Sequence, residues 1–219
     1  MTKIIKETKT KNGNTIQLIE QKPTAFEAVV LFVGVVHGDE PQGKFLIERY
    51  LKENHNLETI KNRFLFIPCL NPDGMEKNQR VNANGVDINR NFCTKNWELT
   101  QKNEFYGGEK AGSEIETSFL TDVINEEKPD VVVTFHAPFK IVNYDGNAKD
   151  IAHELAKITG YPVQADIGYP TAGSFGTFCG IEKNIPTITL EVDETLSNDE
   201  QWERCRGVFT FFENSLKIN

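Results

Sequence analysis

Two kinds of apolar spacing recur along the chain, and together they predict an α/β protein. Four runs rich in β-branched or aromatic residues predict strands over about 28–36, 63–69, 130–135 and 186–192. Apolar residues at helical spacing predict helices over about 41–53, 113–127, 148–159 and 199–216. This alternation is typical of parallel strands joined by helical crossovers, so we expect a largely parallel, mixed β-sheet with helices on both faces.

The two ends of the chain complete this predicted domain. The first segment alternates Lys and Thr and then carries Ile16, Leu18 and Ile19, which predicts a hairpin over about 1–20 at an edge of the sheet. The aromatic residues of the last helix are expected to pack on the sheet rather than to form a binding face. No repeat or linker divides the sequence, so we expect one domain over residues 1–219, large enough to bury a substantial core.

Composition narrows the classes of function. The formal net charge of −8 leaves no basic stripe for phosphates, so nucleic acid is not an expected partner. The four cysteines lack paired metal-ligand spacing and are expected to be free, buried thiols in a reducing compartment. No apolar run has the length of a signal peptide or a membrane span. We therefore predict a cytoplasmic protein without a membrane partner.

The most informative motif follows the first predicted strand. The apolar run 29–36 leads directly into His37, and Gly38, Asp39 and Glu40 come next. The carboxyl ends of strands are where open α/β sheets hold their ligands. An imidazole and a carboxylate three residues apart can converge on one cation if the backbone turns between them, and Gly38 permits that turn. Both groups are ordinary zinc ligands, so the motif predicts part of a zinc site.

A third zinc ligand is expected at another strand end. His136 follows a second buried run, whereas His55 and His153 fall in polar or helical segments where a surface position is expected. A histidine that merely caps a strand is the structural alternative for His136. Together with His37 and Glu40 it would form a set of two histidines and one glutamate. Such a set leaves a coordination position open for water, as catalytic zinc sites do.

A carboxylate also lies inside the last apolar run. Glu191 lies within the run Ile185 to Val192, and a buried, unpaired carboxylate is costly. Either Glu191 has a salt-bridge partner or it serves a chemical purpose. We favour the second interpretation, in which Glu191 is a general base that takes a proton from the attacking water.

The loop between the predicted strands carries further polar groups. Arg80 and Arg90 lie ten residues apart in a segment rich in Asn and Gly. Arginine binds carboxylates through paired hydrogen bonds and can stabilise an oxyanion. Asp87, in the same loop, is placed in sequence to accept a hydrogen bond from a zinc-binding histidine.

Taken in order, these motifs resemble those of the zinc metallocarboxypeptidases of the carboxypeptidase A type. The resemblance runs from about Val29 to about Val192. Within that family, the first motif and the segments 135–138 and 166–177 look like the bacterial murein peptide amidases. The motifs are His37-x-x-Glu40, Asn71-Pro72-Asp73-Gly74, Arg80-x-Asn82, Gly85-Val86-Asp87-x-Asn89-Arg90-Asn91-Phe92, Gly112-Ser113-Glu114, His136 and Thr189-Leu190-Glu191.

The resemblance implies a cofactor and a catalytic group. It implies one zinc ion (Zn²⁺) per chain, bound by His37, Glu40 and His136, with Glu191 as the general base. It also implies that Arg80 polarises the scissile carbonyl.

It further implies a substrate and the residues that bind it. Asn89 and Arg90 would hold the terminal carboxylate of the substrate, and Asp87 would support His37. Murein peptide amidases cut the γ-D-glutamyl–meso-diaminopimelate bond of released cell-wall peptides. The expected function is therefore hydrolysis of L-Ala-γ-D-Glu-meso-diaminopimelate in peptidoglycan recycling.

Two positions depart from the digestive carboxypeptidases. Those enzymes have a basic residue two positions after the first histidine, where this chain has Asp39. They also carry a substrate-closing tyrosine after a Gly-Ser turn, whereas Gly173 and Ser174 are followed here by Phe175. Asp39 either binds the side-chain amine of a diamino acid or is a plain acidic residue at a helix N-terminus, and charge placement favours neither.

Three other functions stay open at this point. The chain could be a general metallocarboxypeptidase, or a zinc-dependent deacylase of N-acyl amino acids on the same scaffold. It could also be an inactive peptide-binding module, which predicts a missing ligand or base. Every expected position is filled, so the inactive module is the least favoured.

Overall fold

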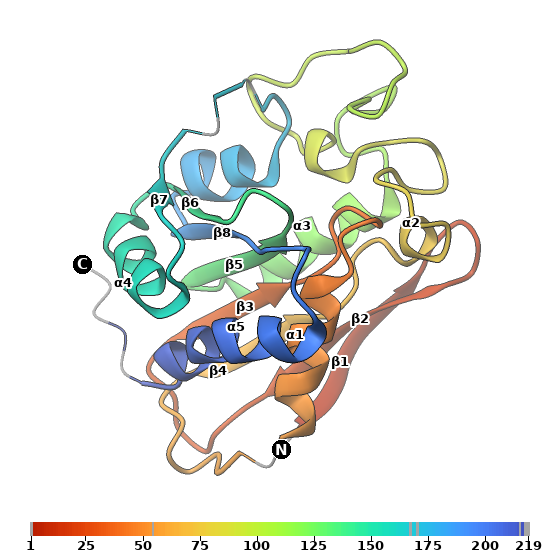
Figure 1. Ribbon diagram of the computed structural model, residues 1–219. Coiled ribbons are helices and arrows are strands. Elements are labelled where there is room, and N and C mark those ends of the chain that lie inside the picture. Colours follow the sequence, from red (N-terminus) through yellow and green to blue (C-terminus); the bar gives the residue numbers. More distant parts are fainter. Residues whose placement is uncertain (1, 54, 167, 170, 215, 217–219) are drawn as a thin grey trace.

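The computed structural model describes residues 2–53, 55–166, 168–169, 171–214 and 216. Within them, eight strands form one mixed sheet with helices on both faces (Figure 1). The strand order is β1-β2-β4-β3-β5-β8-β6-β7. The expected α/β class is therefore confirmed.

The elements lie close to the predicted ranges. The strands are β1 (Thr2–Lys9), β2 (Thr15–Gln21), β3 (Val29–Val33), β4 (Arg63–Ile67), β5 (Val131–His136), β6 (Ile141–Asp145), β7 (Val163–Gln164) and β8 (Thr187–Glu191). The helices are α1 (Gln42–Lys52), α2 (Pro72–Glu76), α3 (Ile115–Glu127), α4 (Lys149–Thr159) and α5 (Asn198–Glu213), with short helical segments η1 (Ile88–Arg90) and η2 (Thr177–Glu182).

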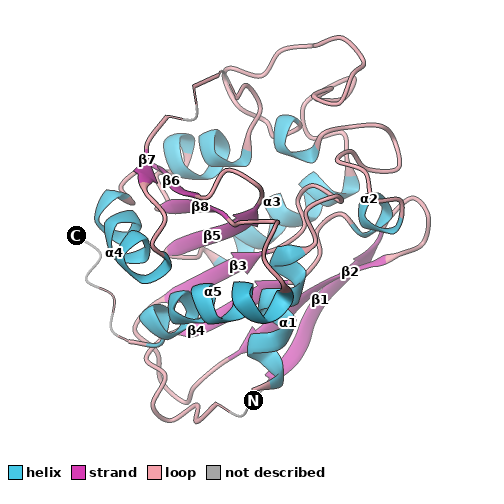
Figure 2. Ribbon diagram, viewed as in Figure 1, coloured by secondary structure: helices cyan, strands magenta, loops and turns pink. Residues whose placement is uncertain are grey.

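The centre of the sheet is parallel, and antiparallel pairs join it to the flanking strands on both sides. β3 pairs in parallel with both β4 and β5, and β5 pairs in parallel with β8. The β1–β2 hairpin and β6 join the sheet in antiparallel pairs. The carboxyl ends of β3, β5 and β8 therefore meet at one edge, where the long loops gather (Figure 2).

Successive side chains of each strand point to opposite faces of the sheet, so the hydrophobic core consists of two layers, one on each face. Val30 and Phe32 face the layer of α1, α4 and α5, and the rings of Phe32 and Phe209 lie 5.0 Å apart. Leu31 and Val33 face the opposite layer, which contains α3 and η2. Figure 1 shows α1 and α5 in front of the sheet and α3 behind it. Both faces are thus covered, and the last helix packs on the sheet as expected.

Several expectations need correction. The first predicted strand ends at Val33 instead of residue 36, because Val35 adopts a left-handed conformation with φ of 52°. The predicted end of the last helix at residue 216 is too late, since α5 ends at Glu213. Of the four free cysteines, Cys93 is exposed rather than buried. Residue 1 of the predicted hairpin and domain, and residues 217–219, lie outside the described part.

His55 also differs from its expected position as a solvated surface group. Its ring stacks on Tyr50 at 3.9 Å, and its Nε2 lies 2.7 Å from the carbonyl oxygen of Tyr50. His55 Nδ1 lies 3.4 Å from a carboxylate oxygen of Glu213. The residue therefore joins the end of α1 to the end of α5. His153 is exposed on α4, as expected.

The Asn71-Pro72-Asp73-Gly74 motif forms the start of α2 and ties it to the N-terminal hairpin. Asn71 caps the helix by accepting a hydrogen bond from the backbone N–H of Gly74 at 2.9 Å. Asp73 is fully buried and accepts hydrogen bonds from Thr10 Oγ1 at 2.6 Å and Asn14 Nδ2 at 2.8 Å. α2 is therefore fixed beside the loop that carries His37.

No helix within the described ranges combines the length and the apolar character that a membrane crossing requires.

Candidate active site

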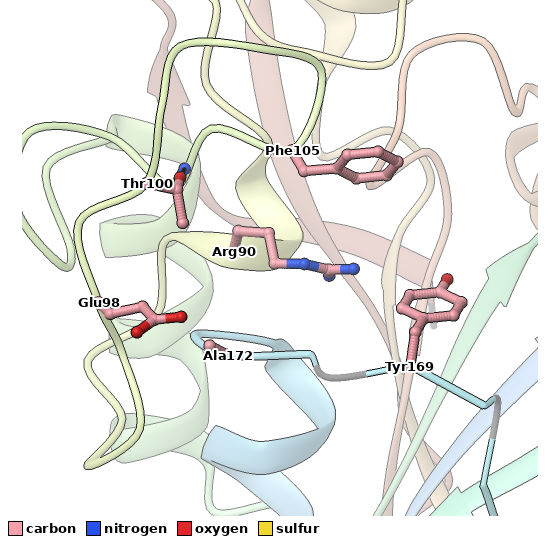
Figure 3. A pocket seen from close by; sticks show the side chains of 7 residues that line it. Arg90, Glu98, Thr100, Phe105, Tyr169 and Ala172 are labelled. Carbon is pink, nitrogen blue, oxygen red and sulfur yellow. Dashed lines mark hydrogen bonds between the residues drawn. The ribbon is translucent and has the colours of Figure 1, made fainter.

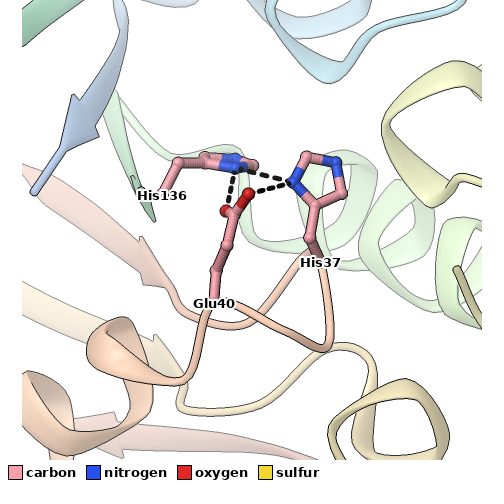
Figure 4. Close-up of side chains that lie close together, drawn as sticks. All are labelled: His37, Glu40 and His136. Atoms are coloured by element: carbon pink, nitrogen blue, oxygen red, sulfur yellow. Dashed lines mark hydrogen bonds and ion pairs between the residues drawn. The ribbon is translucent and has the colours of Figure 1, made fainter. Parts of the chain in front are cut away.

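His37, Glu40 and His136 converge at the carboxyl edge of the parallel strands. His136 is the last residue of β5, and the other two lie in the turn between β3 and α1. Glu40 Oε1 is 2.9 Å from His37 Nδ1, and Glu40 Oε2 is 2.9 Å from His136 Nδ1. The two Nδ1 atoms are 3.2 Å apart. Figure 4 shows the three side chains pointing toward one another.

The turn that carries His37 is held by close backbone packing. A Cβ added to Gly38 would collide with the backbone of Gly74 and Met75 in α2. Gly38 is therefore required for this close approach and not for an unusual φ value. The left-handed Val35 stores strain of about 1–3 kcal/mol next to the site. Its carbonyl oxygen accepts a hydrogen bond from Asn71 N at 2.9 Å, which helps to maintain the turn.

Asp87 fixes the orientation of the His37 ring. Its Oδ1 lies 3.2 Å from His37 Nε2, and the residue is fully buried. An ionised carboxylate can only accept, so Nε2 carries the proton and a neutral His37 ring directs its Nδ1 lone pair toward Glu40. Burial would lower the pKa of His37, but the carboxylates of Glu40 and Asp87 outweigh it and raise the pKa to about 9. The carboxylates therefore stabilise a cation between His37 Nδ1 and Glu40, either a proton or a metal ion.

The pKa values of Glu40 and Asp87 are lowered, whereas that of His37 is raised. Burial would raise the pKa of Glu40, but His37 and His136 outweigh it and hold the pKa well below its usual range. For Asp87, burial is likewise outweighed by His37 and Arg80, and the pKa is lowered. Both groups are therefore anions at neutral pH.

Arg80 lies beside this cluster and is held by Asp87. Its Nε and Nη2 donate to Asp87 Oδ2 at 3.0 and 2.8 Å. Its Nη1 is 3.9 Å from Glu40 Oε1. The guanidinium also lies over the ring of Phe105, 5.1 Å from its centroid. A side chain fixed in this way presents positive charge to the cleft at little further entropic cost.

Glu191 stands next to His136 on the neighbouring strand. The β5–β8 register pairs His136 directly with Glu191, so their side chains share one face of the sheet. Glu191 is 7% exposed, and its Oε2 has no hydrogen-bond partner among the described residues. Burial raises the pKa of Glu191, and this outweighs the opposing effect of His136. The alternative of a salt-bridge partner for Glu191 finds no support within the described part of the chain.

A cleft of about 670 Å³ opens over these groups. Asn89 and Arg90 line it, and η1 carries both of them. Asn89 Oδ1 accepts a hydrogen bond from Phe175 N at 2.8 Å, and Arg90 Nη1 donates to the Asn89 carbonyl oxygen at 2.7 Å. Asp39 also lines the cleft and is exposed. The cleft is thus lined by every predicted metal-binding, catalytic and substrate-binding residue, while Asp87 lies buried behind His37.

Tyr169 also lines the cleft, and the sequence, which places it in the motif at 166–177, predicted no role for it. It also borders an adjoining pocket of about 440 Å³, in which the guanidinium of Arg90 extends between Phe105 and Tyr169 (Figure 3). The family resemblance predicts a tyrosine after the Gly173-Ser174 turn, whereas Tyr169 precedes this turn. Ile167 and Pro170 of the motif at 166–177 lie outside the described residues.

A family model described as zinc carboxypeptidase matches residues 1–153. The chain belongs to the zinc carboxypeptidase family. Its membership makes the protein a hydrolase of the metallopeptidase type, and it implies zinc as the metal. The resemblance stated from the sequence motifs is confirmed.

Individual relatives within the family are also similar over most of the chain. Murein peptide amidase A of Escherichia coli K12 is 32% identical over 194 residues, which cover 83% of this chain and 78% of that protein. The crystal structure of a murein-tripeptide amidase from Escherichia coli O157 matches with a TM-score of 0.83 at 27% identity, over 99% of this chain and 93% of that one. Carboxypeptidase A of Helicoverpa armigera shares the fold, with a TM-score of 0.72 at 17% identity over 96% and 66% of the chains.

The donor set of this chain fits the zinc that the family implies. Ligand atoms about 2.0–2.1 Å from a tetrahedral ion lie roughly 3.3 Å apart, and the separations of 2.9–3.2 Å among the three donors come close to this. His37, Glu40 and His136 are also the one His/Cys/Asp/Glu cluster of metal-ligand spacing within the described ranges. His37 Nδ1, His136 Nδ1 and the Glu40 carboxylate face one another, and a metal ion between them would bind all three.

Proposed function

We propose that this member of the zinc carboxypeptidase family hydrolyses the γ-D-glutamyl–meso-diaminopimelate amide bond of the murein tripeptide L-Ala-γ-D-Glu-meso-diaminopimelate. The observation that carries the proposal is the similarity to murein peptide amidase A along 83% of the chain, together with the convergence of the metal donors and Glu191 in one cleft. The reaction would serve the recycling of cell-wall peptides in a bacterium.

The metal site of this proposal holds one zinc ion per chain. His37, Glu40 and His136 would bind it, and the hydrogen bond from His37 Nε2 to Asp87 would keep the ring oriented. When bound, zinc supplies a Lewis acid that polarises a carbonyl and makes water more acidic.

Glu191 and Arg80 are the proposed catalytic residues. Glu191 takes the proton of the attacking water and later delivers it to the leaving amine, and its raised pKa suits both steps. Arg80 donates to the oxygen that becomes negative in the transition state. Its contacts with Asp87 hold the guanidinium at the edge of the cleft in advance.

Asn89 and Arg90 are the proposed anchor for the terminal carboxylate. Arginine pairs with carboxylates in a directional way, and this pairing would fix the last amide bond beside the metal. The enzyme would then be an exopeptidase. Asp39 lines the same cleft, so substrate contact through Asp39 stays a prediction.

We further propose one catalytic domain over residues 1–219 in the cytoplasm. All cysteines lie in the described part of the chain, and none forms a disulfide there, which suits a reducing compartment.

A substrate panel tests the proposal. The zinc-loaded protein is incubated with the murein tripeptide, with α-linked peptides ending in Phe or Leu, and with N-acyl amino acids, and the products are identified by mass spectrometry. We expect release of diaminopimelate and little turnover of the other compounds. Efficient release of C-terminal Phe or Leu would indicate a general carboxypeptidase, and deacylation would indicate the N-acyl amino acid deacylase.

A further inference from the structure

The guanidinium of Arg80 is bound to Asp87 through only one oxygen atom. Its Nε and Nη2 both donate to Asp87 Oδ2, at 3.0 and 2.8 Å. The other carboxylate oxygen, Oδ1, lies 3.2 Å from His37 Nε2 and accepts from the backbone N–H of Asn89 at 2.8 Å. Paired bonds to two oxygens would fix the plane of a guanidinium, whereas two bonds to one oxygen leave the plane free to turn about that atom. Asp87 alone therefore holds the position of the guanidinium but not its plane.

The free end of Arg80 has competing acceptors beside it. Its Nη1 lies 3.3 Å from His37 Nδ1 and 3.9 Å from Glu40 Oε1. Both atoms belong to the proposed metal site, and neither is the substrate oxygen that Arg80 is proposed to contact. A guanidinium that turned toward these atoms would lose its contact with the substrate, so the orientation of its plane matters for the reaction.

The ring of Phe105 supplies the missing contact. Arg80 Cζ lies 5.1 Å from the ring centroid. A cation over an aromatic face is attracted by the π electrons of the ring, and the flat guanidinium can stack on it. Phe105 lines the cleft and is 43% exposed, so it contributes little to the hydrophobic core. Figure 3 shows its ring extending away from the loop that carries it.

The segment that carries Phe105 is tied to the residue that holds Arg80. The carbonyl oxygen of Tyr106 accepts a hydrogen bond from the backbone N–H of Asp87 at 2.8 Å. The backbone N–H of Phe105 itself donates to Asn103 Oδ1 at 2.8 Å. Tyr106 is buried, although Phe105 next to it is exposed. The ring is therefore presented to Arg80 from an anchored stretch of backbone.

We propose that Phe105 is a positioning residue for Arg80. Asp87 holds the guanidinium in place, and the ring of Phe105 fixes its plane so that Nη1 faces the substrate and not the metal ligands. The ring also shields one face of the guanidinium from water, which strengthens the attraction between Arg80 and a negative oxygen. The inference rests on the proposed role of Arg80, and Phe105 itself takes part in no bond-making step.

Three substitutions separate the aromatic face of Phe105 from its apolar bulk. F105A removes the ring, F105L keeps apolar bulk without a π face, and F105Y keeps the ring. We expect kcat of F105A and F105L to fall about three- to thirtyfold, the range of a cation–π contact, while KM changes by less than about twofold. F105Y should retain the wild-type kcat. A raised KM at unchanged kcat would indicate direct substrate contact instead and would overturn the proposal.

F26A is the matched control for these variants. Phe26 is 41% exposed, and Lys22 Nζ lies 5.2 Å from its ring centroid, so the substitution removes the same kind of contact. Phe26 precedes the amino end of β3, whereas the cleft lies at the carboxyl ends of the parallel strands. We expect F26A to keep the wild-type kcat. An equal loss in F26A and F105A would assign the effect to general destabilisation and would contradict the proposal.

A double-mutant cycle shows whether Phe105 acts through Arg80. In the R80A background we expect F105A to have no further effect on kcat, because the guanidinium that the ring orients is absent. Losses that simply add would show that Phe105 acts independently of Arg80 and would count against the proposal. The cycle is run on whichever peptide the wild type cleaves, the murein tripeptide or an α-linked peptide, so a failure of the proposed amidase function leaves this test intact.

A spectroscopic readout at Arg80 does not depend on turnover. Nitrogen-15 relaxation of the Arg80 Nε–H group reports the mobility of the guanidinium, and the signal is assigned by its disappearance in R80A. We expect this group to be more mobile in F105A than in the wild type, F105Y and F26A. Equal mobility in F105A and the wild type would overturn the proposal, even if the protein cleaves none of the peptides.

Discussion

At the scale of single residues, the metal site depends on three side chains that no other described residue can replace. We expect the H136A variant to lose zinc and activity together, because two remaining protein ligands hold zinc poorly. The measurement is the zinc content after dialysis against a metal buffer. H153A, which alters an exposed histidine of α4, is the control and should keep full zinc. Full zinc occupancy in H136A would remove this residue from the site.

A substitution at Glu191 tests proton transfer separately from metal binding. The E191Q variant preserves the size of the side chain but cannot accept a proton, so we expect turnover to fall by about 10²–10⁴ while zinc content and substrate binding persist. Single-turnover kinetics and calorimetric binding of the tripeptide measure the two effects. Near-normal turnover of the zinc-loaded variant would exclude the role of general base.

The location of these residues could be predicted because it follows from local sequence. His37, His136 and Glu191 each follow a buried apolar run, and parallel strands bring their carboxyl ends to one edge. The role of Tyr169 could not be found in this way. Its position depends on how the loop before η2 packs across the cleft.

At the scale of secondary-structure elements, long apolar segments were predictable and short or strained ones were not. The central strands and the longer helices agree with their predicted ranges to within a few residues. β6 and β7 are short and partly polar, so no periodicity indicated them. The early end of β3 depends on the φ value of Val35, which is imposed by contacts with the segment around Asn71.

The contact between α2 and the N-terminal hairpin gives a prediction at this scale. D73A removes the acceptor for Thr10 Oγ1, Asn12 N and Asn14 Nδ2, and leaves buried donors unsatisfied. We expect the free energy of unfolding to fall by about 2–4 kcal/mol in urea titrations. D122A changes an exposed carboxylate and should stay within about 0.5 kcal/mol of the wild type. Equal stability of D73A and D122A would show that this contact does not anchor α2.

At the scale of the whole molecule, the metal site links stability to pH. In the metal-free protein the pKa of His37 is raised from 6.5 to about 9, so the stabilisation from its proton is complete below about pH 6.5 and is lost toward pH 9. This loss amounts to at most roughly 3 kcal/mol. Zinc takes the place of the proton, so the zinc-loaded protein should lack this decline.

Urea unfolding at pH 6.5 and pH 9, with a chelator or with zinc, measures this difference. Zinc should also raise the free energy of unfolding by about 2.7 kcal/mol at a free concentration of one hundred times Kd. A metal-free protein that is equally stable at both pH values would contradict the electrostatic description of His37.

The central claim is that this chain hydrolyses one defined amide bond of the murein tripeptide. The most direct test is mass spectrometry of the products formed by the zinc-loaded enzyme from L-Ala-γ-D-Glu-meso-diaminopimelate in oxygen-18 water. We predict free diaminopimelate without label and L-Ala-D-Glu with one labelled oxygen in its γ-carboxyl group. An intact tripeptide, or label in the carboxyl group of released alanine, would contradict the claim.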